Sequence, residues 1–356
     1  MPDAKSRTLS FADAITEATT EAMREDESVI LYGLGVNDPG RVFGTTQGLL
    51  EEFGPSRVFE TPTAENAMTG IAVGAALGGL RPIVTHQRFD FFLLAMDQLV
   101  NSAAKWRYMF GGQFEVPIVI RLITGRGWGQ GPTHSQSFHS WLAHVPGLKV
   151  VVPSNPGDAK AMLKSSIADP NPVVFIENRW LHNKTGLVPK ISAVDSLGMS
   201  RVVRRGTDVT IVALGMMVDE AISAADKLDS HGVSCEVIDI RSVNPLDRST
   251  IGASAKKTGR LLALDFSHNS GSVVHTLISG LLEDFSAQDM VAARTLTVED
   301  IPQPTSFSVS ESWYPSMSQI FVAVLELMGE ESASGLRLSS LTLEGDQSQL
   351  PFDGPF

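Results

Sequence analysis

Glu65 stands at the head of a run of small apolar residues that extends to Ala76. Thr61 and Pro62, just upstream, are typical of a helix start, where a capping hydroxyl precedes the residue that fits the first turn. The predicted helix, Glu65–Leu77, contains almost nothing polar, so we expect it to be deeply buried. A carboxylate in that position either caps free backbone N–H groups or works as an acid or base. The segment alone leaves both interpretations open.

His134 is a second candidate, because it closes a glycine-rich segment over residues 121–137 that follows a predicted strand end. Open α/β sheets place their ligands at such ends. The glycines lack the spacing of a dinucleotide loop or a P-loop. His134 is therefore either a turn histidine or a functional group. His139 and His144 follow at five-residue steps, which do not share a helical face, so we expect packing or capping roles for them. The sequence contains no Gly-x-Ser-x-Gly elbow, which argues against a serine hydrolase.

Two further segments combine polar groups in ways that suit ligands. Residues 85–92 read Thr-His-Gln-Arg-Phe-Asp-Phe-Phe. They form either core aromatics beneath a salt bridge or a ring-stacking wall with amide and guanidinium donors. Residues 167–172 read Ile-Ala-Asp-Pro-Asn-Pro, a composition typical of a turn. The same turn could present carbonyl and carboxylate oxygens to a cation.

Short apolar runs alternate with helical patterns, which predicts an α/β protein with largely parallel sheets. The predicted strands of the first half are Val29–Tyr32, Ile83–Gln87, Ile118–Leu122, Val150–Pro153 and Val173–Glu177. Helices are predicted between them at Phe11–Met23, Glu65–Leu77, Phe92–Phe110 and Asp158–Ile167. In the second half the strands are Val209–Leu214, Cys235–Ile240 and Arg260–Asp265, and the helices are Val218–Leu228, Leu246–Lys256 and Ser272–Phe285. We expect domains over 1–190 and 205–329, a linker over 191–204 and a loose tail over 330–356.

The composition of the 356-residue chain excludes several classes of function. With 43% hydrophobic and 19% charged residues it is typical of a globular protein, and no apolar run is long enough to span a bilayer. The net charge of −12, without any basic run, argues against nucleic acid or an anionic membrane as a partner. The single cysteine, Cys235, lies between valines, which predicts a buried, inert thiol. These features, with no secretory signal at the N-terminus, predict a cytoplasmic protein.

Taken together, these segments resemble the beta subunit of the thiamine-diphosphate-dependent, decarboxylating component of 2-oxo acid dehydrogenase complexes. This is the family of pyruvate and branched-chain 2-oxo acid dehydrogenase beta subunits, and the resemblance runs from about Leu9 to about Met328. The matching motifs are residues 43–49, 53–66, 97–105, 134–137, 144–151, 237–241, 245–247 and 257–261. The resemblance implies a two-domain transketolase-like α/β fold, with an N-terminal parallel-sheet pyrimidine-binding domain and a C-terminal transketolase-type α/β domain.

The resemblance also implies roles for particular residues. Glu65 would hydrogen-bond the aminopyrimidine ring of thiamine diphosphate and so promote loss of the thiazolium C2 proton, after which the cofactor attacks the 2-oxo acid. A buried carboxylate suits this task, because it can share a proton with a ring nitrogen. Phe91 falls beside the pyrimidine, Gln87 at a polar cofactor contact and Thr63 at a backbone contact. His134 would orient substrate and supply a proton during acyl transfer to a lipoyl group.

Metal and partner expectations follow from the same resemblance. Asp169 and Asn171, with a carbonyl near Ser166, match a structural potassium site of some members. The chain lacks the Gly-Asp-Gly motif with which thiamine-diphosphate enzymes hold Mg²⁺ and the diphosphate. The resemblance therefore implies that an alpha subunit supplies these groups in an α2β2 heterotetramer. It further implies a small 2-oxo acid substrate and a lipoyl acyltransferase core as acceptor.

The chain departs from the family at several points. Leu34 stands where the family usually has a glutamate, residues 85–88 lack the usual acid, and residues 265–271 replace an acid-Gly-Gly pattern. These changes bear on substrate and acceptor more than on cofactor. A lipoyl-linked dehydrogenase subunit is the favoured hypothesis. The alternatives are a carboligase or transketolase-like subunit that passes the acyl or ketol unit to an aldehyde, and a non-catalytic scaffold. Retention of both Glu65 and His134 argues against the scaffold.

Overall fold

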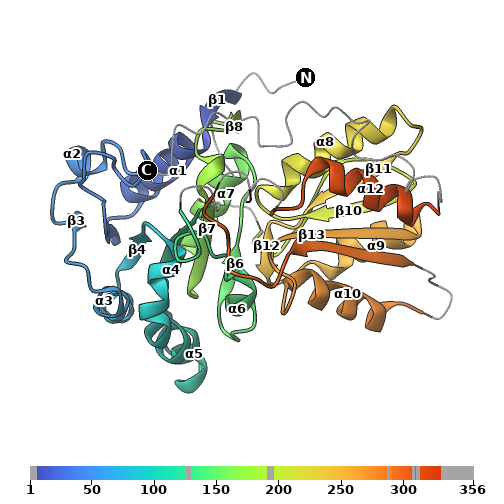
Figure 1. Ribbon diagram of the computed structural model, residues 1–356. Helices are drawn as coiled ribbons and strands as arrows, with labels where there is room; N and C mark the ends of the chain where they lie inside the picture. Colours follow the sequence, from blue (N-terminus) through green and yellow to red (C-terminus); the bar gives the residue numbers. More distant parts are fainter. Residues whose placement is uncertain are drawn as a thin grey trace. The chain divides into compact units, whose positions relative to one another are not determined.

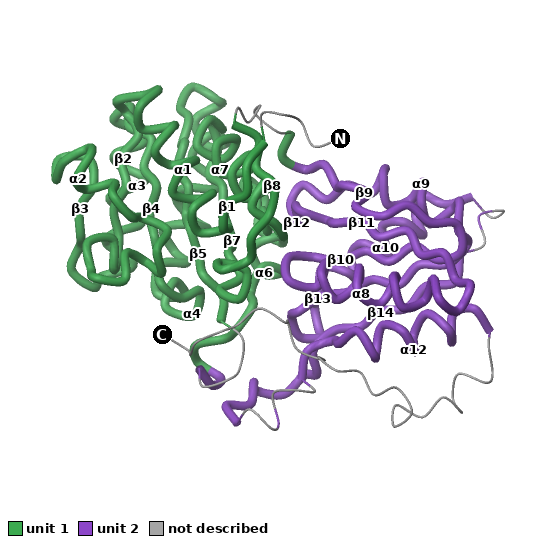
Figure 2. Tube along the Cα trace, turned by 90° about the horizontal axis from the view of Figure 1, so that it is seen from above, with its two compact units in different colours: residues 1–126, 133–197 green, residues 127–132, 198–356 purple. Residues whose placement is uncertain are grey.

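The chain divides into two compact α/β units (Figure 2). Unit 1 comprises residues 1–126 and 133–197, and unit 2 comprises residues 127–132 and 198–356. The computed structural model describes residues 6–125, 130–190, 196–286, 289, 291–306, 309 and 313–329. The boundary between the two units falls between Leu197 and Gly198, and the linker over 191–204 stays a prediction. The tail predicted over 330–356 lies outside the described residues.

Unit 1 is centred on a parallel sheet whose strands lie in the order β6-β7-β5-β4-β2-β3 (Figure 1). The strands are β2 (Val29–Gly33), β3 (Val58–Glu60), β4 (Arg81–His86), β5 (Val119–Thr124), β6 (Lys149–Val151) and β7 (Val173–Asn178). Every residue of β2, β5 and β7 is buried, as expected for parallel strands covered on both faces. A separate antiparallel pair joins β1 (Ser6–Ser10) to β8 (Thr185–Pro189). Because β2, β5 and β7 are buried along their length, polar side chains are expected mainly at the strand ends.

The helices of unit 1 begin where the sequence supplies caps. Ser10 accepts a hydrogen bond from the Asp13 backbone at the start of α1, and Asn155 does the same for α7 ahead of Pro156. The helices are α1 (Phe11–Glu25), α2 (Leu49–Phe53), α3 (Glu65–Leu77), α4 (Phe89–Phe92), α5 (Ala104–Met109), α6 (His139–Ala143) and α7 (Pro156–Ala168). Shorter turns are η1 (Leu93–Ala95), η2 (Gln98–Ala103) and η3 (Arg179–Leu181). Buried Lys160 of α7 pairs with Glu17 and joins α7 to α1.

Unit 2 has a sheet of strand order β14-β13-β10-β11-β9. Its strands are β9 (Arg201–Arg204), β10 (Val209–Ala213), β11 (Cys235–Asp239), β13 (Arg260–His268) and β14 (Ala292–Val298), and the short strand β12 (Ser242–Asn244) does not belong to this sheet. All pairs are parallel except the edge pair of β9 with β11. Helices α8 (Met217–Asp229) and α12 (Met317–Leu327) pack together on one face, and α9 (Arg248–Thr258) and α10 (Val273–Asp284) lie on the other (Figure 1).

Most sequence-predicted elements are confirmed, and α3 has the predicted bounds. The predicted helix Phe92–Phe110 is wrong as a single helix. It is divided into α4, a 3₁₀ turn, the π-helical η2 and α5. These turns keep a spacing of apolar residues close to that of an α-helix, so the pattern does not reveal the break. Strands β1, β3, β8, β9 and β14 and helices α2, α6 and α12 are elements that the sequence reasoning missed.

The start of α3 differs from the sequence-based expectation. The N-cap residue is Ala64, which provides no side-chain cap, and Thr61 and Pro62 lie ahead of the helix. The backbone N–H of Thr61 instead donates to the carbonyl of Gly33 at 3.3 Å, so Thr61 extends the contact between the ends of β3 and β2. The expected deep burial of α3 is also wrong for one face. Ile71 is 58% exposed and Gly74 is exposed, which leaves an uncovered strip of small and apolar residues.

None of the described helices is long and apolar enough to cross a membrane. Cys235 is fully buried on β11, and burial raises the pKa of its thiol to about 12. The thiol is therefore protonated at neutral pH and unreactive, as its valine neighbours predict.

Candidate active site in unit 1

The carboxyl ends of β2, β3 and β4 meet at one edge of the sheet, and hydrogen bonds tie the loops there together. Glu60, at the end of β3, accepts hydrogen bonds from the backbone N–H groups of Gly35 at 2.6 Å and Asn37 at 3.0 Å. In the same loop Asp38 accepts a hydrogen bond from Gln87 Nε2 at 3.4 Å. A Cβ on Gly35 would lie 2.1 Å from that nitrogen, so only glycine permits this approach. The loop and Gln87 are thus fixed before any ligand binds.

Glu65 lies in the first turn of α3 and is 5% exposed. Its carboxylate makes no hydrogen bond or ion pair with any described residue, so the capping interpretation finds no support there. The carboxylate of this nearly buried residue thus has acceptor capacity that no described residue uses. Its placement therefore suits a donor that comes from outside this chain, such as a ring nitrogen of a ligand.

Phe91 and His134 are brought together from α4 and from the segment that precedes α6. Their ring centroids lie 5.2 Å apart at an interplanar angle of 85°. Both side chains are half-buried, and Thr133 Oγ1 lies 3.0 Å from His134 Nδ1. Asp90, next to Phe91, is 8% exposed, and burial raises the pKa of its carboxyl group. An aromatic face and an imidazole ring therefore lie together at this place.

Within the described part of the chain, the other residues predicted to contact the cofactor are not linked to the Phe91–His134 pair. Thr63 is exposed in the coil before α3, and Gln87 is half-buried just after β4. Among the described residues, no hydrogen bond or ring contact links Thr63, Glu65 or Gln87 to the Phe91–His134 pair. These positions share the end of the sheet, so a bound ligand rather than direct contact would have to connect them. His139 is buried in α6 and His144 is its C-cap residue, in keeping with packing and capping roles.

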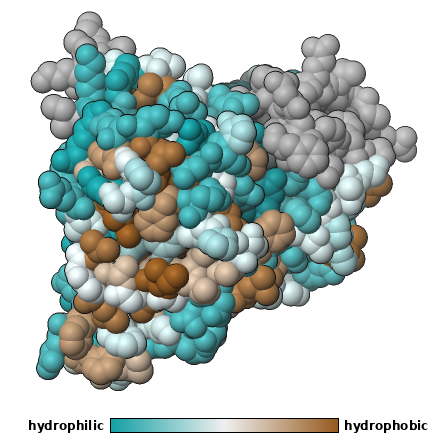
Figure 3. Space-filling model, turned by 90° about the vertical axis from the view of Figure 1, so that its left-hand side faces the viewer, coloured by the Kyte–Doolittle hydropathy of each residue, from teal (hydrophilic) through white to brown (hydrophobic). Residues whose placement is uncertain are grey.

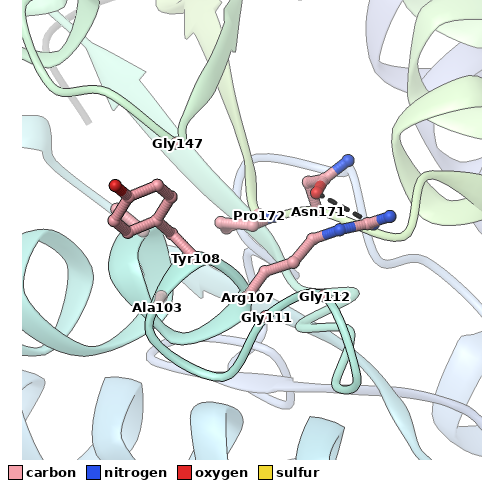
Figure 4. A pocket seen from close by; sticks show the side chains of 9 residues that line it. Ala103, Arg107, Tyr108, Gly111, Gly112, Gly147, Asn171 and Pro172 are labelled. Atoms are coloured by element: carbon pink, nitrogen blue, oxygen red, sulfur yellow. Dashed lines mark hydrogen bonds between the residues drawn. The ribbon is translucent and has the colours of Figure 1, made fainter.

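The predicted potassium ligands lie elsewhere, at the end of α7. Asp169 Oδ1 accepts hydrogen bonds from the Asn171 backbone at 2.9 Å and its side chain at 3.0 Å. The other carboxylate oxygen of Asp169 pairs with Lys149 Nζ. Asn171 Oδ1 accepts a hydrogen bond from Arg107 at 3.2 Å, at the rim of a pocket of about 470 Å³ (Figure 4).

The backbone oxygens of this turn are engaged as well. Arg81 donates to the carbonyls of Ile167 at 2.9 Å and Asp169 at 3.4 Å, and the carbonyl of Ser166 accepts from the Asp169 backbone at 3.4 Å. Lys149 therefore pairs with the one charged group of the turn, and Arg107 and Arg81 already donate to its amide and carbonyl oxygens. The arrangement does not fit a bound potassium ion. No group of three or more His, Cys, Asp or Glu side chains able to hold a metal occurs among the described residues.

Arg179 and the loop of residues 41–43 were missed by sequence reasoning, which had named only the Arg88 guanidinium as a possible donor. The guanidinium groups of Arg88 and Arg179 lie 5.0 Å and 4.6 Å from the ring centroid of Phe43, within cation–π range. Arg41, Val42 and Phe43 all have left-handed backbones, with φ of 47°, 48° and 59°. Strain of this kind in non-glycine residues is concentrated at functional sites. No local sequence pattern predicts this left-handed backbone, because the loop is shaped by contacts with distant residues.

Two family models cover most of the chain. "Transketolase, pyrimidine binding domain" matches residues 7–184, and "Transketolase, C-terminal domain" matches residues 198–320. Among solved structures, a chain described as "Split gene transketolase, inactive beta4 tetramer" matches with a TM-score of 0.74 and 22% identity, covering 90% of this chain and 99% of that one. Fold and matches together define a transketolase-like protein with two α/β units, which confirms the fold class expected from the sequence.

Sequence relatives narrow this class. The chain is 39% identical to the pyruvate dehydrogenase E1 component subunit beta of Rhizobium meliloti, over 89% of this chain and 69% of that one. It is 41% identical to the mitochondrial subunit beta-2 of Oryza sativa subsp. japonica, over 89% and 85%. It is 40% identical to the acetoin:2,6-dichlorophenolindophenol oxidoreductase subunit beta of Bacillus subtilis, over 91% and 98%. The chain belongs to the family of beta subunits of thiamine-diphosphate-dependent 2-oxo acid dehydrogenases.

Proposed function

We propose that this chain decarboxylates a small 2-oxo acid and transfers the acyl group to a lipoyl acceptor, in the cytoplasm, as the beta subunit of an α2β2 heterotetramer. The observation that carries the proposal is Glu65, a nearly buried residue at the head of α3 whose carboxylate accepts no hydrogen bond from any described residue. It lies in the segment matched by the pyrimidine-binding family model. The Phe91–His134 pair adds an aromatic wall and an imidazole ring beside it.

The residues fit the aminopyrimidine half of thiamine diphosphate. When bound, the cofactor supplies a carbon nucleophile and takes up the electrons released as carbon dioxide leaves. Glu65 would hold a proton against a ring nitrogen, a task favoured by its nearly complete burial. Phe91 would offer its face to the ring, and Gln87 and the backbone at Thr63 would orient it. His134 would supply a proton where the acyl group passes to one sulfur of the lipoyl disulfide, while the S–S bond breaks and the other sulfur leaves as a thiol.

A second chain is needed to complete this site. The described residues hold no acidic cluster for Mg²⁺, and the diphosphate requires a metal. Unit 1 also exposes large apolar side chains, among them Ile71 at 58% and Leu94 at 68%. Figure 3, which views the side on which α3 lies in Figure 1, shows hydrophobic residues gathered on this face. Exposed patches of this kind mark protein interfaces, so we assign the face to the alpha subunit.

A second candidate concerns the acyl acceptor. One relative is named for the oxidation of acetoin, a 2-hydroxy ketone of the kind that forms when an acyl unit adds to an aldehyde. A carboligase or transketolase-like subunit would use an aldehyde acceptor in place of lipoyl. A lipoylated domain and a set of aldehydes, offered to the reconstituted pair with each 2-oxo acid, separate the two. Acyl-lipoyl product supports the dehydrogenase, and carbon–carbon bond formation alone supports the alternative.

The test of the main proposal begins with copurification of this chain with alpha subunits encoded nearby. Titration calorimetry with thiamine diphosphate and Mg²⁺ then compares the chain alone, the alpha subunit alone and the pair. Tight binding by the pair only is the expected result. Tight binding by this chain alone would show that the diphosphate site is misplaced. Binding by no pair would favour the scaffold interpretation.

A further inference from the structure

The position of His134 depends on side-chain contacts, because the segment around it has no regular secondary structure. Residues 132–138 form turns and coil between β5 and α6. Phe91 contacts the His134 ring, and Phe89 packs against Phe138 with ring centroids 5.7 Å apart. Both contacts are apolar and come from α4. Ring packing of this kind limits how far the segment can move, but it does not fix the direction of an imidazole nitrogen.

Asp90 supplies the directional contact. Its Oδ1 accepts a hydrogen bond from Gln136 Nε2 at 2.8 Å and a second from the Gln136 backbone N–H at 3.3 Å. One carboxylate oxygen thus holds both the main chain and the side chain of the residue two positions after His134. Asp90 is itself 8% exposed, so water competes weakly for these bonds.

The second oxygen of Asp90 shows that the carboxylate is not there for stability alone. Oδ2 is buried and has no hydrogen-bond partner in the described part of the chain. A buried acceptor without a donor destabilises the fold. An amide or a smaller side chain at position 90 would therefore destabilise the fold less than the Asp90 carboxylate does. Its two neighbours in the chain, Phe89 and Phe91, both pack on the segment that carries His134.

We propose that Asp90 is a positioning residue for His134, which it holds in place for acyl transfer by clamping Gln136. The inference rests on the proposed function, in which His134 serves the transfer step. Asp90 touches neither reacting atom in this role. Its effect is therefore confined to the step that uses His134, and decarboxylation, which depends on Glu65, continues.

The test uses the reconstituted pair and two assays on each variant. Decarboxylation is followed with an artificial electron acceptor, and acyl transfer is followed with a lipoylated domain. Asp90→Ala is expected to lower kcat for acyl transfer by about 10- to 100-fold, since a small misplacement of a catalytic group can have that effect. The dye-linked rate should change by less than about threefold. KM for the 2-oxo acid should stay the same.

Conservative replacement separates positioning from general damage. Asp90→Asn keeps an Oδ1 acceptor for both Gln136 bonds, so it should restore most of the acyl-transfer rate. Gln136→Leu should reproduce the Asp90→Ala defect, and the double variant should be no worse than either single one. Glu27→Ala, at an exposed position without a recorded side-chain bond, is the matched control. Equal loss in both assays, or failure of Asp90→Asn to rescue, would overturn the proposal.

A third readout does not require activity. Hydrogen exchange followed by mass spectrometry on the full chain should show faster exchange in peptides covering residues 133–138 for Asp90→Ala but not for Asp90→Asn. Unchanged exchange in Asp90→Ala would overturn the clamp. If the unmodified pair decarboxylated no 2-oxo acid, the proposed function would fail. The exchange data would then still decide whether Asp90 holds the His134 segment.

Discussion

Arg121 and Glu177 form a two-bond ion pair in the interior of unit 1, across the adjacent strands β5 and β7. Arg121 Nε donates to Glu177 Oε1 at 2.6 Å and Nη2 donates to Oε2 at 3.0 Å. The side chains are 1% and 0% exposed. Burial would raise the pKa of Glu177, but the charge of Arg121 and hydrogen bonds outweigh it and lower the pKa to about 2. The pair lies beneath the carboxyl edge that carries the candidate site.

Arg121→Met is expected to destabilise the protein by about 3–5 kcal/mol, because it leaves the Glu177 carboxylate buried without its partner. The double variant Arg121→Met with Glu177→Leu should recover most of that loss, since an apolar pair of similar volume avoids the uncompensated charge. Urea unfolding followed by circular dichroism measures both. A double variant as unstable as the single one would show that packing around Arg121, not its charge, is what matters.

His86 should make stability depend on pH. Both ring nitrogens are buried without a hydrogen-bond partner in the described part of the chain, and burial lowers the pKa of the ring to about 3. A histidine in the unfolded chain has a pKa near 6.5, so below this pH it is protonated while the ring of His86 in the folded protein stays neutral. Stability from this group is therefore complete above pH 6.5 and falls as the pH drops toward 3. Between pH 7 and 5 the loss is about 2 kcal/mol.

His86→Phe should remove this slope and stabilise the protein at pH 7 by about 1–3 kcal/mol, since it replaces two unsatisfied polar atoms by carbon. The neighbouring ring of Phe92, 4.9 Å away, already provides an aromatic contact. Thermal unfolding between pH 5 and 8 measures the slope. His144→Asn, at an exposed position, is the control. A slope that survives in His86→Phe would place the titrating group elsewhere.

The sequence was most informative where local chemistry determines structure. The run Val173–Glu177 predicts a strand correctly, because its first four residues are apolar, as expected for a parallel strand buried on both faces. Short β3 and polar β9 carry no such signal. Glu65 could be found from its type and surroundings, whereas the roles of Phe91 and His134 came from the resemblance. The clamp of Asp90 on Gln136 could not be found from the sequence, since it joins positions that meet only after the sheet forms.

The turn at the end of α7 should not respond to potassium. Lys149 and Arg107 already occupy the side-chain oxygens of Asp169 and Asn171. The melting temperature should therefore be the same in potassium and sodium salts at equal ionic strength. Lys149→Met should lower stability by about 1 kcal/mol, because the pair is partly solvent-exposed. Lys256→Met, which removes an exposed pair with Asp289, is the control. Selective stabilisation by potassium in the unmodified protein would show that the ion displaces Lys149.

Glu65→Gln should leave the chain folded and able to bind its alpha subunit, because the amide has the shape of the carboxylate it replaces. The reconstituted pair should lose about 10²- to 10⁴-fold in the rate of decarboxylation, the usual size of an acid–base contribution. Single-turnover carbon dioxide release measures the effect. Glu283→Gln, at an exposed position of α10, is the matched control. Unchanged activity in Glu65→Gln would favour the scaffold interpretation.

Gly74→Leu tests the exposed strip of α3. A Cβ at Gly74 meets nothing within 4 Å in this chain, so the isolated subunit has room for the new side chain. Replacing a helix-interior glycine should even favour the helix by about 0.5–1 kcal/mol. If the strip packs closely against the alpha subunit, the leucine side chain prevents the alpha subunit from packing against α3. The expected result is a normally folded chain that no longer copurifies with alpha and no longer supports cofactor binding.

The control for this variant is Ala253→Leu, which adds a leucine at an exposed position of α9 in unit 2. It should leave both folding and association unchanged. Circular dichroism and size-exclusion chromatography of the mixed subunits read out the two properties separately. Because the substitution favours the isolated helix, a loss of association cannot be traced to unfolding. Association of Gly74→Leu with unchanged affinity would show that the apolar strip faces something other than the alpha subunit.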